Sequence, residues 1–123
     1  VLLLHGTVCK NHWIECNKEY SAEYVFNSKG IPKCTCGGTV KPDVVLYEEP
    51  LDENVITKAV EAIKNCDLLI VAGTSLVVYP AASYIRYFNG KYLVIVNIDS
   101  TSYDGMADLV IHDKLGNVFS KLK

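Results

Sequence analysis

The sequence predicts an α/β fold, in which a parallel sheet is joined to a small cysteine-containing module, and two observations support this. Over residues 43–123, short apolar runs alternate with helical patterns in the order strand–helix–strand–helix–strand–helix. Right-handed crossovers between consecutive strands of this kind build a parallel sheet. Residues 9–42 are instead polar and contain four of the five cysteines, a clustering that is typical of a metal site.

The beginning of the chain predicts three short elements. Val1–Leu4 is an apolar run and predicts a short buried strand. Ser21–Phe26 is long enough for about two turns of helix. Ile31–Val40 contains one proline and two glycines, which predicts turns and a short hairpin.

The middle of the chain predicts a strand and then an amphipathic helix. Val44–Tyr47 has the composition of a strand. Asp52 is a good N-cap for a helix that ends near Asn65. The apolar positions of this helix form one stripe, which consists of Val55, Ala59, Ala62, Ile63 and Cys66.

The rest of the chain alternates between buried strands and helices. Leu68–Ala72 is fully apolar, as is usual for a parallel strand that is covered on both faces. Pro80 suits the first turn of a helix that ends near Phe88. The remaining elements are two strands and a terminal helix: Tyr92–Val96, Leu109–Ile111 and Gly116–Leu122.

The composition excludes several classes of protein. Half of the residues are hydrophobic and 21% are charged, which excludes an intrinsically disordered tail. The formal net charge is −2, so the chain has no electrostatic footprint for nucleic acid or an anionic membrane. The longest apolar runs, Leu68–Ala72 and Leu93–Val96, are too short to span a bilayer.

The cysteines and the first residues indicate an intracellular protein. An odd number of cysteines argues against a secreted disulfide framework. Val1–Leu4 has neither the basic region nor the length of a signal peptide, so we expect a cytoplasmic location. The single methionine is Met106 and the chain opens inside an apolar run, so we expect a fragment, a processed product or a trimmed chain.

Small polar residues follow the predicted parallel strands at their carboxyl ends, where ligands of such sheets bind. Glycine lets a phosphate approach the backbone, hydroxyl groups donate to it, and a carboxylate accepts from ribose hydroxyls. This pattern predicts a nucleotide site, although each loop taken alone is also compatible with an ordinary turn. The residues at these ends are Gly73, Thr74, Ser75, Asn97, Asp99 and the stretch 112–115.

Several blocks of the sequence, taken in order, resemble the sirtuin family. They are residues 5–7, 34–38, 41–49, 73–81, 94–99 and 107–111. The resemblance implies a Rossmann-like NAD-binding domain, here residues 1–8 and 43–123, that carries a small zinc-ribbon-like module, here residues 9–42. It also implies NAD-dependent removal of acyl groups from protein lysines, with NAD as cofactor and an acyl-lysine protein or peptide as partner.

The resemblance also implies roles for particular residues. His5 matches the catalytic general base, although a structural histidine at a strand end is the alternative. Val45, Leu46 and Tyr47 match the strand that pairs with the substrate peptide, and Leu76–Val78 match the strand on its other side. The residues that match NAD-contacting positions are Gly73, Thr74, Ser75, Val78, Asn97, Asp99, Lys114 and Leu115.

The expected zinc site is incomplete. Cys16, Cys34 and Cys36 match three family ligands, but Trp13 stands where the fourth cysteine is expected, and tryptophan cannot ligate zinc. The fourth ligand is therefore Cys9 or His12, or a water molecule, or the module has lost its metal.

Direct binding of nucleic acid or a membrane is not expected.

Further departures qualify the expected activity. Glu48 replaces a glycine beside the substrate strand, Asp99 replaces a glutamate, and Leu115 is larger than the residue usual there. The upstream NAD loops of a complete sirtuin are absent from residues 1–123, so we expect this chain alone to be inactive. The alternatives are a non-catalytic module that binds a nucleotide or a partner, and a scaffold whose cysteine module docks other proteins.

Overall fold

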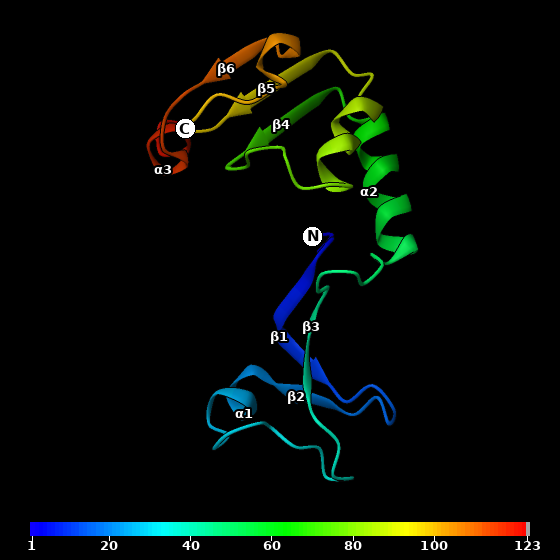
Figure 1. Ribbon diagram of the computed structural model, residues 1–123. Coiled ribbons are helices and arrows are strands. Elements are labelled where there is room, and N and C mark those ends of the chain that lie inside the picture. Colours follow the sequence, from blue (N-terminus) through cyan, green and yellow to red (C-terminus); the bar gives the residue numbers. More distant parts are fainter. Residues whose placement is uncertain (123) are drawn as a thin grey trace. The chain divides into compact units, whose positions relative to one another are not determined.

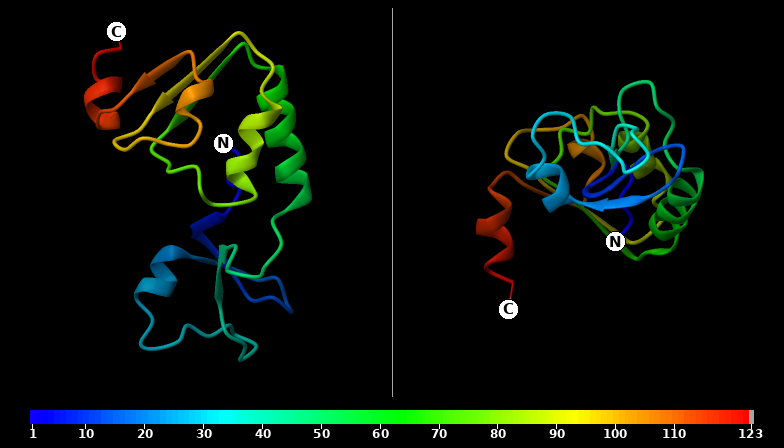
Figure 2. Two further views of the ribbon diagram at one scale, coloured as in Figure 1. Left: turned by 45° about the horizontal axis from the view of Figure 1, so that its top comes forward. Right: turned by 90° about the horizontal axis from the view of Figure 1, so that it is seen from below.

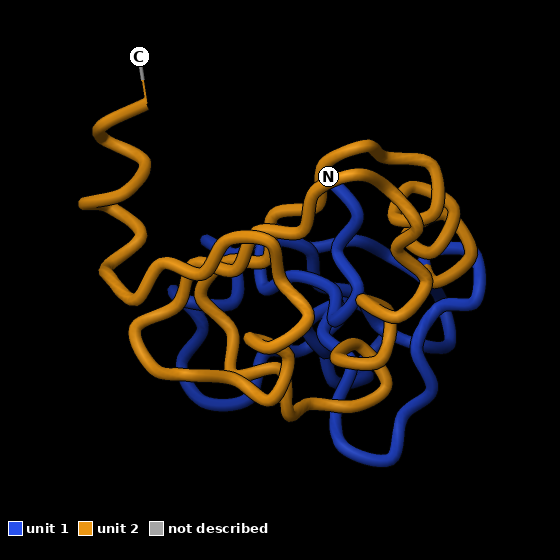
Figure 3. The backbone as a smooth tube through the Cα atoms, turned by 90° about the horizontal axis from the view of Figure 1, so that it is seen from above, with its two compact units in different colours: residues 1–55 blue, residues 56–123 orange. Residues whose placement is uncertain are grey.

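The computed structural model describes residues 1–122 and has the predicted α/β architecture (Figure 1). The chain divides into two compact units, residues 1–55 and 56–123 (Figure 3). The first unit contains an antiparallel sheet and a cluster of three cysteines. The second contains a three-stranded parallel sheet.

The first unit is built on the antiparallel order β2-β1-β3, which joins β1 (Gly6–His12), β2 (Glu19–Ser21) and β3 (Lys41–Val44) (Figure 1). A short helix, α1 (Ala22–Phe26), follows β2 directly. The Ser21 hydroxyl caps this helix by accepting from the Tyr24 N–H at 3.2 Å. The expected hairpin is reduced to a single bridge between Lys33 and Thr39.

A tight backbone contact and a buried amide fix the sheet of the first unit. Gly6 has φ +75° and its Cα faces the carbonyl of Asp43 so closely that no Cβ would fit. Asn11 is 2% exposed, and its amide nitrogen donates to the carbonyls of Val8 and Tyr20. The only other buried residues of this unit, among those described, are Cys34 and Val40.

Two predicted strands of this unit are placed differently in the structure. Val1–Leu4 has no strand, and its first three residues are exposed, because no described strand pairs with it. The strand predicted at Val44–Tyr47 ends at Val44, since β3 covers Lys41–Val44. The chain then turns between Leu46 and Glu49. The Glu49 N–H donates to the Leu46 carbonyl, and the Glu49 carboxylate accepts from the Leu46 N–H.

The second unit has the predicted order of strands and helices. β4 (Leu68–Ala72), β5 (Tyr92–Val96) and β6 (Leu109–Ile111) are parallel in the order β4-β5-β6. Their bounds agree with the prediction. The terminal helix α3 (Leu115–Phe119) begins one residue before the predicted start and ends earlier than predicted.

The helix α2 (Glu53–Asn65) begins where the sequence predicts. The Asp52 carboxylate accepts from the N–H groups of Asn54 and Val55 at 2.8 and 3.2 Å. The helix predicted after Pro80 is a 3₁₀ helix, Ala81–Tyr87, and it runs beside α2 (Figure 2). The Lys64 ammonium group of α2 lies 5.3 Å from the centre of the Tyr87 ring.

The core of the second unit covers one face of the parallel sheet. Ile95 on the central strand is fully buried and Leu93 is 2% exposed. They pack with Leu76, with Ala82 and Ile85 of the 3₁₀ helix, and with Tyr103. The runs at 68–72 and 92–96 supply the strand residues of this core, but Leu68 and Ile70 of β4 are exposed, so the strand expected to be covered on both faces is covered on one. Among the described residues, no helix has both the length and the apolar character needed to cross a membrane.

Candidate functional site

Backbone hydrogen bonds hold together the loops that follow the three parallel strands. The Gly73 N–H, after β4, donates to the carbonyl of Val96 at 2.9 Å. The Asn97 N–H, after β5, donates to the carbonyl of Ile111 at 3.1 Å. The predicted nucleotide-contacting loops therefore lie along one edge of the sheet, at its carboxyl ends, as the βαβ topology requires.

The loop after β4 has an unusual backbone. Gly73 has φ +64° and Leu76 has φ +54°, and the Thr74 hydroxyl accepts from the Leu76 N–H at 3.1 Å. A Cβ on Gly73 would come within 2.9 Å of Cδ1 of Leu115, so the loops after β4 and β6 are in contact there. Gly73, Thr74 and Ser75 are all exposed. The loop thus presents glycine backbone and two hydroxyl groups to solvent, as a phosphate or ribose site requires.

In the loop after β5, the side-chain amide of Asn97 is hydrogen-bonded and the carboxylate of Asp99 is exposed. The Asn97 amide donates to the carbonyl of Asp99 at 2.8 Å, which fixes the turn, and Asp99 is exposed. After β6, the Lys114 N–H donates to the carboxylate of Asp113 at 2.7 Å. The amide of Asn117 and this N–H lower the pKa of Asp113 below its ordinary value.

A polar network that no sequence motif predicts joins residues of these loops. His112 lies with Nδ1 3.2 Å from the carbonyl of Asn97 and Nε2 3.3 Å from the carboxylate of Asp104. The Thr101 hydroxyl donates to Asp104 at 2.6 Å, and this bond is the main reason that the pKa of Asp104 is lowered. Only the position of His112, directly after β6, indicated a role at the strand ends.

In the first unit, the predicted general base adjoins the predicted substrate segment. The Val45 N–H donates to the carbonyl of His5 at 3.1 Å, and the side chain of His5 is exposed. Leu46 and Tyr47 are also exposed. Neither His5 nor the segment 45–47 is in a strand, because β1 begins at Gly6 and β3 ends at Val44.

The side chain of Glu49 stabilises the turn at residues 46–49 by hydrogen bonds. Its carboxylate accepts from the Leu46 N–H at 2.9 Å and from the Lys41 ammonium at 2.6 Å. The Leu46 N–H and the Lys41 charge lower the pKa of Glu49 below its ordinary value. Glu48, one residue earlier, is exposed and has φ +69°, a conformation that favours glycine.

The three predicted metal ligands come together in the first unit. The sulfur of Cys34 lies 3.5 Å from that of Cys16 and 3.2 Å from that of Cys36, and the remaining pair is 3.8 Å apart. Cys34 is buried, whereas Cys16 and Cys36 are exposed. Three sulfurs this close can bind one metal ion.

The thiols of this cluster differ in acidity. A hydrogen bond from the Cys36 backbone, and a further one from the Tyr20 hydroxyl, lower the pKa of Cys34 to about 6. The Gly38 backbone acts in the same direction on Cys36, but the contacts with Cys34 and Cys16 and desolvation outweigh it and raise the pKa of Cys36. The buried cysteine is thus the one that most readily becomes a thiolate.

The described residues supply no fourth ligand. No other His, Cys, Asp or Glu of residues 1–122 offers an atom within 4.8 Å of all three sulfurs. Cys9 and His12, the predicted alternatives, lie on β1 outside this cluster. A closed structural zinc site needs four protein ligands, so the residues present do not fit one.

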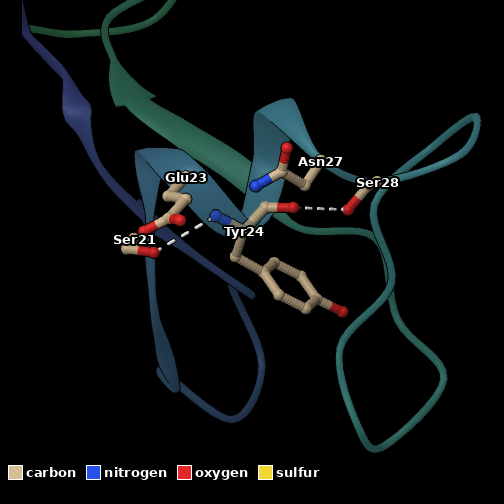
Figure 4. A pocket seen from close by; sticks show the side chains of 5 residues that line it. All are labelled: Ser21, Glu23, Tyr24, Asn27 and Ser28. Atoms are coloured by element: carbon tan, nitrogen blue, oxygen red, sulfur yellow. Dashed lines mark hydrogen bonds between the residues drawn. The ribbon is translucent and has the colours of Figure 1, made fainter.

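A shallow pocket beside α1 is lined by Ser21, Glu23, Tyr24, Asn27 and Ser28 (Figure 4). Its three hydroxyl groups are already engaged. Ser21 accepts from the Tyr24 N–H, Ser28 donates to the Tyr24 carbonyl at 2.7 Å, and the Tyr24 hydroxyl donates to the Lys33 carbonyl at 2.6 Å. No residue predicted from the sequence to act in a site lines it. This pocket therefore shares no residue with the strand-end loops or the cysteine cluster.

Comparison with known proteins points to one family. The model of the Sir2 family matches residues 1–80. An NAD-dependent protein deacetylase of Clostridium perfringens is 56% identical over 124 residues, covering 99% of this chain and 51% of the relative. A protein of the same name from Cutibacterium acnes is 47% identical, covering the whole chain and 50% of the relative.

Solved structures agree with these sequence relatives. The structure described as "Sir2-p53 peptide-NAD+" superposes with a TM-score of 0.85 at 32% identity, covering 96% of this chain and 52% of that chain. The structure described as "Sir2 bound to acetylated peptide" gives the same TM-score, identity and coverage. The chain thus spans about half the length of the relatives that it matches.

Proposed function

Because this chain belongs to the Sir2 family, we propose that it provides one half of an NAD-dependent protein lysine deacylase. The observation that carries the proposal is the joined set of strand-end loops, in which Gly73 bonds Val96 and Asn97 bonds Ile111. The relatives of about twice its length are named NAD-dependent protein deacetylases. In this proposal, residues 1–8 and 43–123 belong to the NAD-binding domain and residues 9–42 to the cysteine module.

The strand-end loops suit a dinucleotide. Gly73, Thr74 and Ser75 would face its phosphates, because Gly73 has no side chain to block the approach and Thr74 and Ser75 offer hydroxyl groups on an exposed loop. Asp99 would accept from ribose hydroxyls, and Asn97 holds the turn that presents it. The other residues assigned to NAD are Val78, Lys114 and Leu115.

His5 is the proposed general base. An imidazole titrates near neutral pH, so it can take a proton from a ribose hydroxyl and return it later in the cycle. When bound, NAD would supply the ribose carbon that accepts the acyl group and the nicotinamide that leaves. The backbone bond from Val45 to His5 supports this assignment, because it joins His5 to the first residue of the segment assigned to the substrate.

Val45, Leu46 and Tyr47 are the residues proposed to contact the acyl-lysine peptide. Leu46 and Tyr47 are exposed, which leaves their side chains open to a partner. In this structure, however, the Leu46 N–H is engaged by Glu49. A peptide can therefore pair with the Leu46 N–H only if the hydrogen bond from Leu46 to Glu49 breaks. Otherwise the peptide must bond the neighbouring residues.

The experiment compares the 123-residue chain with the same chain extended at its N-terminus to the length of its relatives. Each is incubated with NAD and an acetyl-lysine peptide, and nicotinamide release is measured. We expect release only from the extended protein, because a dinucleotide site has contacts beyond these three loops. If the extended protein binds NAD but releases no nicotinamide, the alternative of a non-catalytic nucleotide-binding module is favoured instead.

A further inference from the structure

We propose that Cys16, Cys34 and Cys36 form a three-thiolate metal site whose fourth coordination position is filled from solution and not by the protein. The proposal does not depend on the deacylase function. It concerns a thiophilic divalent cation and an exchangeable fourth ligand, such as water or a small nitrogen base. It is carried by the positions of the three sulfurs, by Trp13, and by the exposure of the cluster.

The sulfurs form a triangle of the size that one metal ion needs. Their separations are 3.2, 3.5 and 3.8 Å. A zinc–sulfur bond of about 2.3 Å in a regular tetrahedron places neighbouring sulfurs about 3.8 Å apart. The three thiols therefore occupy one face of a tetrahedron after small adjustments, and one vertex is left.

The backbone that holds the ligands is ordered without the fourth one. In the first turn, the Asn17 N–H donates to the Trp13 carbonyl at 2.8 Å, and Asn17 has φ +55°. In the second turn, the Cys34 N–H donates to the Gly38 carbonyl at 2.7 Å and the Gly37 N–H to the Cys34 carbonyl at 2.8 Å. Lys18 connects the turns by donating to the Thr35 hydroxyl at 3.2 Å.

Trp13 occupies the place from which a fourth ligand would come. It opens the first turn three residues before Cys16, as Cys34 opens the second turn two residues before Cys36. Its indole ring lies directly over Gly38, so that a Cβ on Gly38 would collide with the ring. The indole nitrogen is only a donor, so this side chain fills space beside the site without ligating the metal.

Solvent can reach the open position. Cys16 and Cys36 are exposed, and no other His, Cys, Asp or Glu among residues 1–122 reaches the three sulfurs. Protein sites with three ligands keep a fourth position for water or another small ligand, whereas structural sites close it. Thiolates favour soft and borderline ions such as zinc. The site is thus predicted to bind its metal with an exchangeable ligand.

The test uses cobalt(II) as the metal, added without oxygen to the reduced 123-residue chain. Tetrahedral cobalt–thiolate sites have visible absorption bands that respond to each ligand. We expect these bands on binding, and a shift of the bands when imidazole is added, because imidazole replaces the fourth ligand. Bands that do not move with imidazole would overturn the proposal, since they would reveal a fourth protein ligand. A failure to bind cobalt would overturn it as well.

Two variants sharpen the test. Trp13→Cys supplies the missing thiol, so it should abolish the imidazole shift and slow the loss of metal to a chelator. A change in outer contacts alone alters metal affinity by about 10–100-fold, so a direct ligand should slow the loss by at least about tenfold. Trp13→Phe is the matched control, because it keeps an aromatic ring near Gly38 and should retain the shift. If Trp13→Cys does not fold, the imidazole titration of the unmodified chain still decides the question.

Discussion

The backbone N–H of Val45 donates to the carbonyl of His5, and this bond joins two segments that are 40 residues apart in the chain. It continues the pairing of β1 with β3 past the last ladder pair, Gly6 with Val44. Gly6 permits the close approach, because its Cα faces the Asp43 carbonyl with no room for a Cβ. The position of the proposed base is therefore set by the sheet and by one glycine.

The first prediction concerns His5 as the general base. In the protein extended to the length of its relatives, His5→Ala should lower turnover by about 10²–10⁴-fold, the usual contribution of a general base. NAD affinity should change little, because the proposed NAD contacts lie in the strand-end loops. Nicotinamide release and NAD titration measure the two effects. His12→Ala is the control, and equal effects of the two substitutions would contradict the assignment.

The second prediction concerns Gly73. A Cβ there would meet Leu115 at 2.9 Å, and the residue has φ +64°, so Gly73→Ala should strain the loop by about 1–2 kcal/mol. If the loop relieves this strain by leaving its NAD-binding position, that energy corresponds to a loss of roughly tenfold in NAD affinity, which is measured by titration of the extended protein. Gly105→Ala is the matched control, because a Cβ on Gly105 meets nothing within 4 Å. A normal NAD affinity in Gly73→Ala would remove this loop from the site.

The sequence was sufficient to predict the parallel sheet. The runs at 68–72, 92–96 and 109–111 are apolar at almost every position, which predicts strands, and their bounds agree with the structure, although one face of β4 is exposed. The family could be inferred from linear motifs for the same reason, and the Sir2 family model confirms it. Short stretches of sequence are therefore enough to predict both the strands of the parallel sheet and the family.

Long-range contacts explain what the sequence analysis missed. Val1–Leu4 is apolar like the true strands, but a strand also needs a neighbour, and no described segment pairs with it. The Val44–Tyr47 strand is cut short because Glu49 and Lys41, eight residues apart, close a turn. The bond between His112 and Asp104 depends on how two loops meet, which no local pattern encodes.

The third prediction concerns the departure at Glu48. Its φ of +69° is unfavourable for a residue with a side chain, at about 1–3 kcal/mol, and its exposed side chain offers little in return. Glu48→Gly should therefore raise the free energy of unfolding by about 1 kcal/mol, less the entropy that glycine gains in the unfolded chain. Urea unfolding measures this, followed by the fluorescence of Trp13, the single tryptophan, for the first unit and by far-ultraviolet circular dichroism for the helix α2.

Glu61 provides the matched control for Glu48. It is also an exposed glutamate, but it lies inside α2, where glycine is unfavourable. Glu61→Gly should destabilise the chain by about 1 kcal/mol, the opposite sign. A loss of stability in both variants would indicate that the backbone at Glu48 is not strained.

The fourth prediction concerns the pH dependence of the second unit. The Thr101 hydroxyl, and then the other bonds from Thr101 and His112, lower the pKa of Asp104 in the folded state. A carboxylate with a lowered folded pKa stabilises the fold at pH values above the unfolded value of about 3.9, and this contribution is lost as the pH falls through the folded pKa. Asp104→Asn should therefore lower the Tm at pH 7 and have a smaller effect near pH 3.

Asp67→Asn is the control for this comparison. Asp67 is exposed, and its carboxylate has no hydrogen-bond partner among the described residues. Thermal unfolding of the two variants and the unmodified chain at several pH values isolates the contribution of Asp104. An effect of Asp104→Asn that is as large at pH 3 as at pH 7 would mean that the residue acts by packing and not by its charge.

The last prediction concerns removal of the metal from the cysteine cluster. The first unit buries only Cys34, Val40 and Asn11 among its described residues, whereas the second unit has its own apolar core around Ile95. A metal bound to the proposed site would therefore contribute directly to the stability of residues 9–42, because few apolar contacts would replace it. A strong chelator should speed amide exchange in the two turns, 13–18 and 34–38, and leave β4 and β5 protected. Exchange measured by mass spectrometry with and without chelator tests this, and equal acceleration in both units would show that the sheet depends on the metal as well.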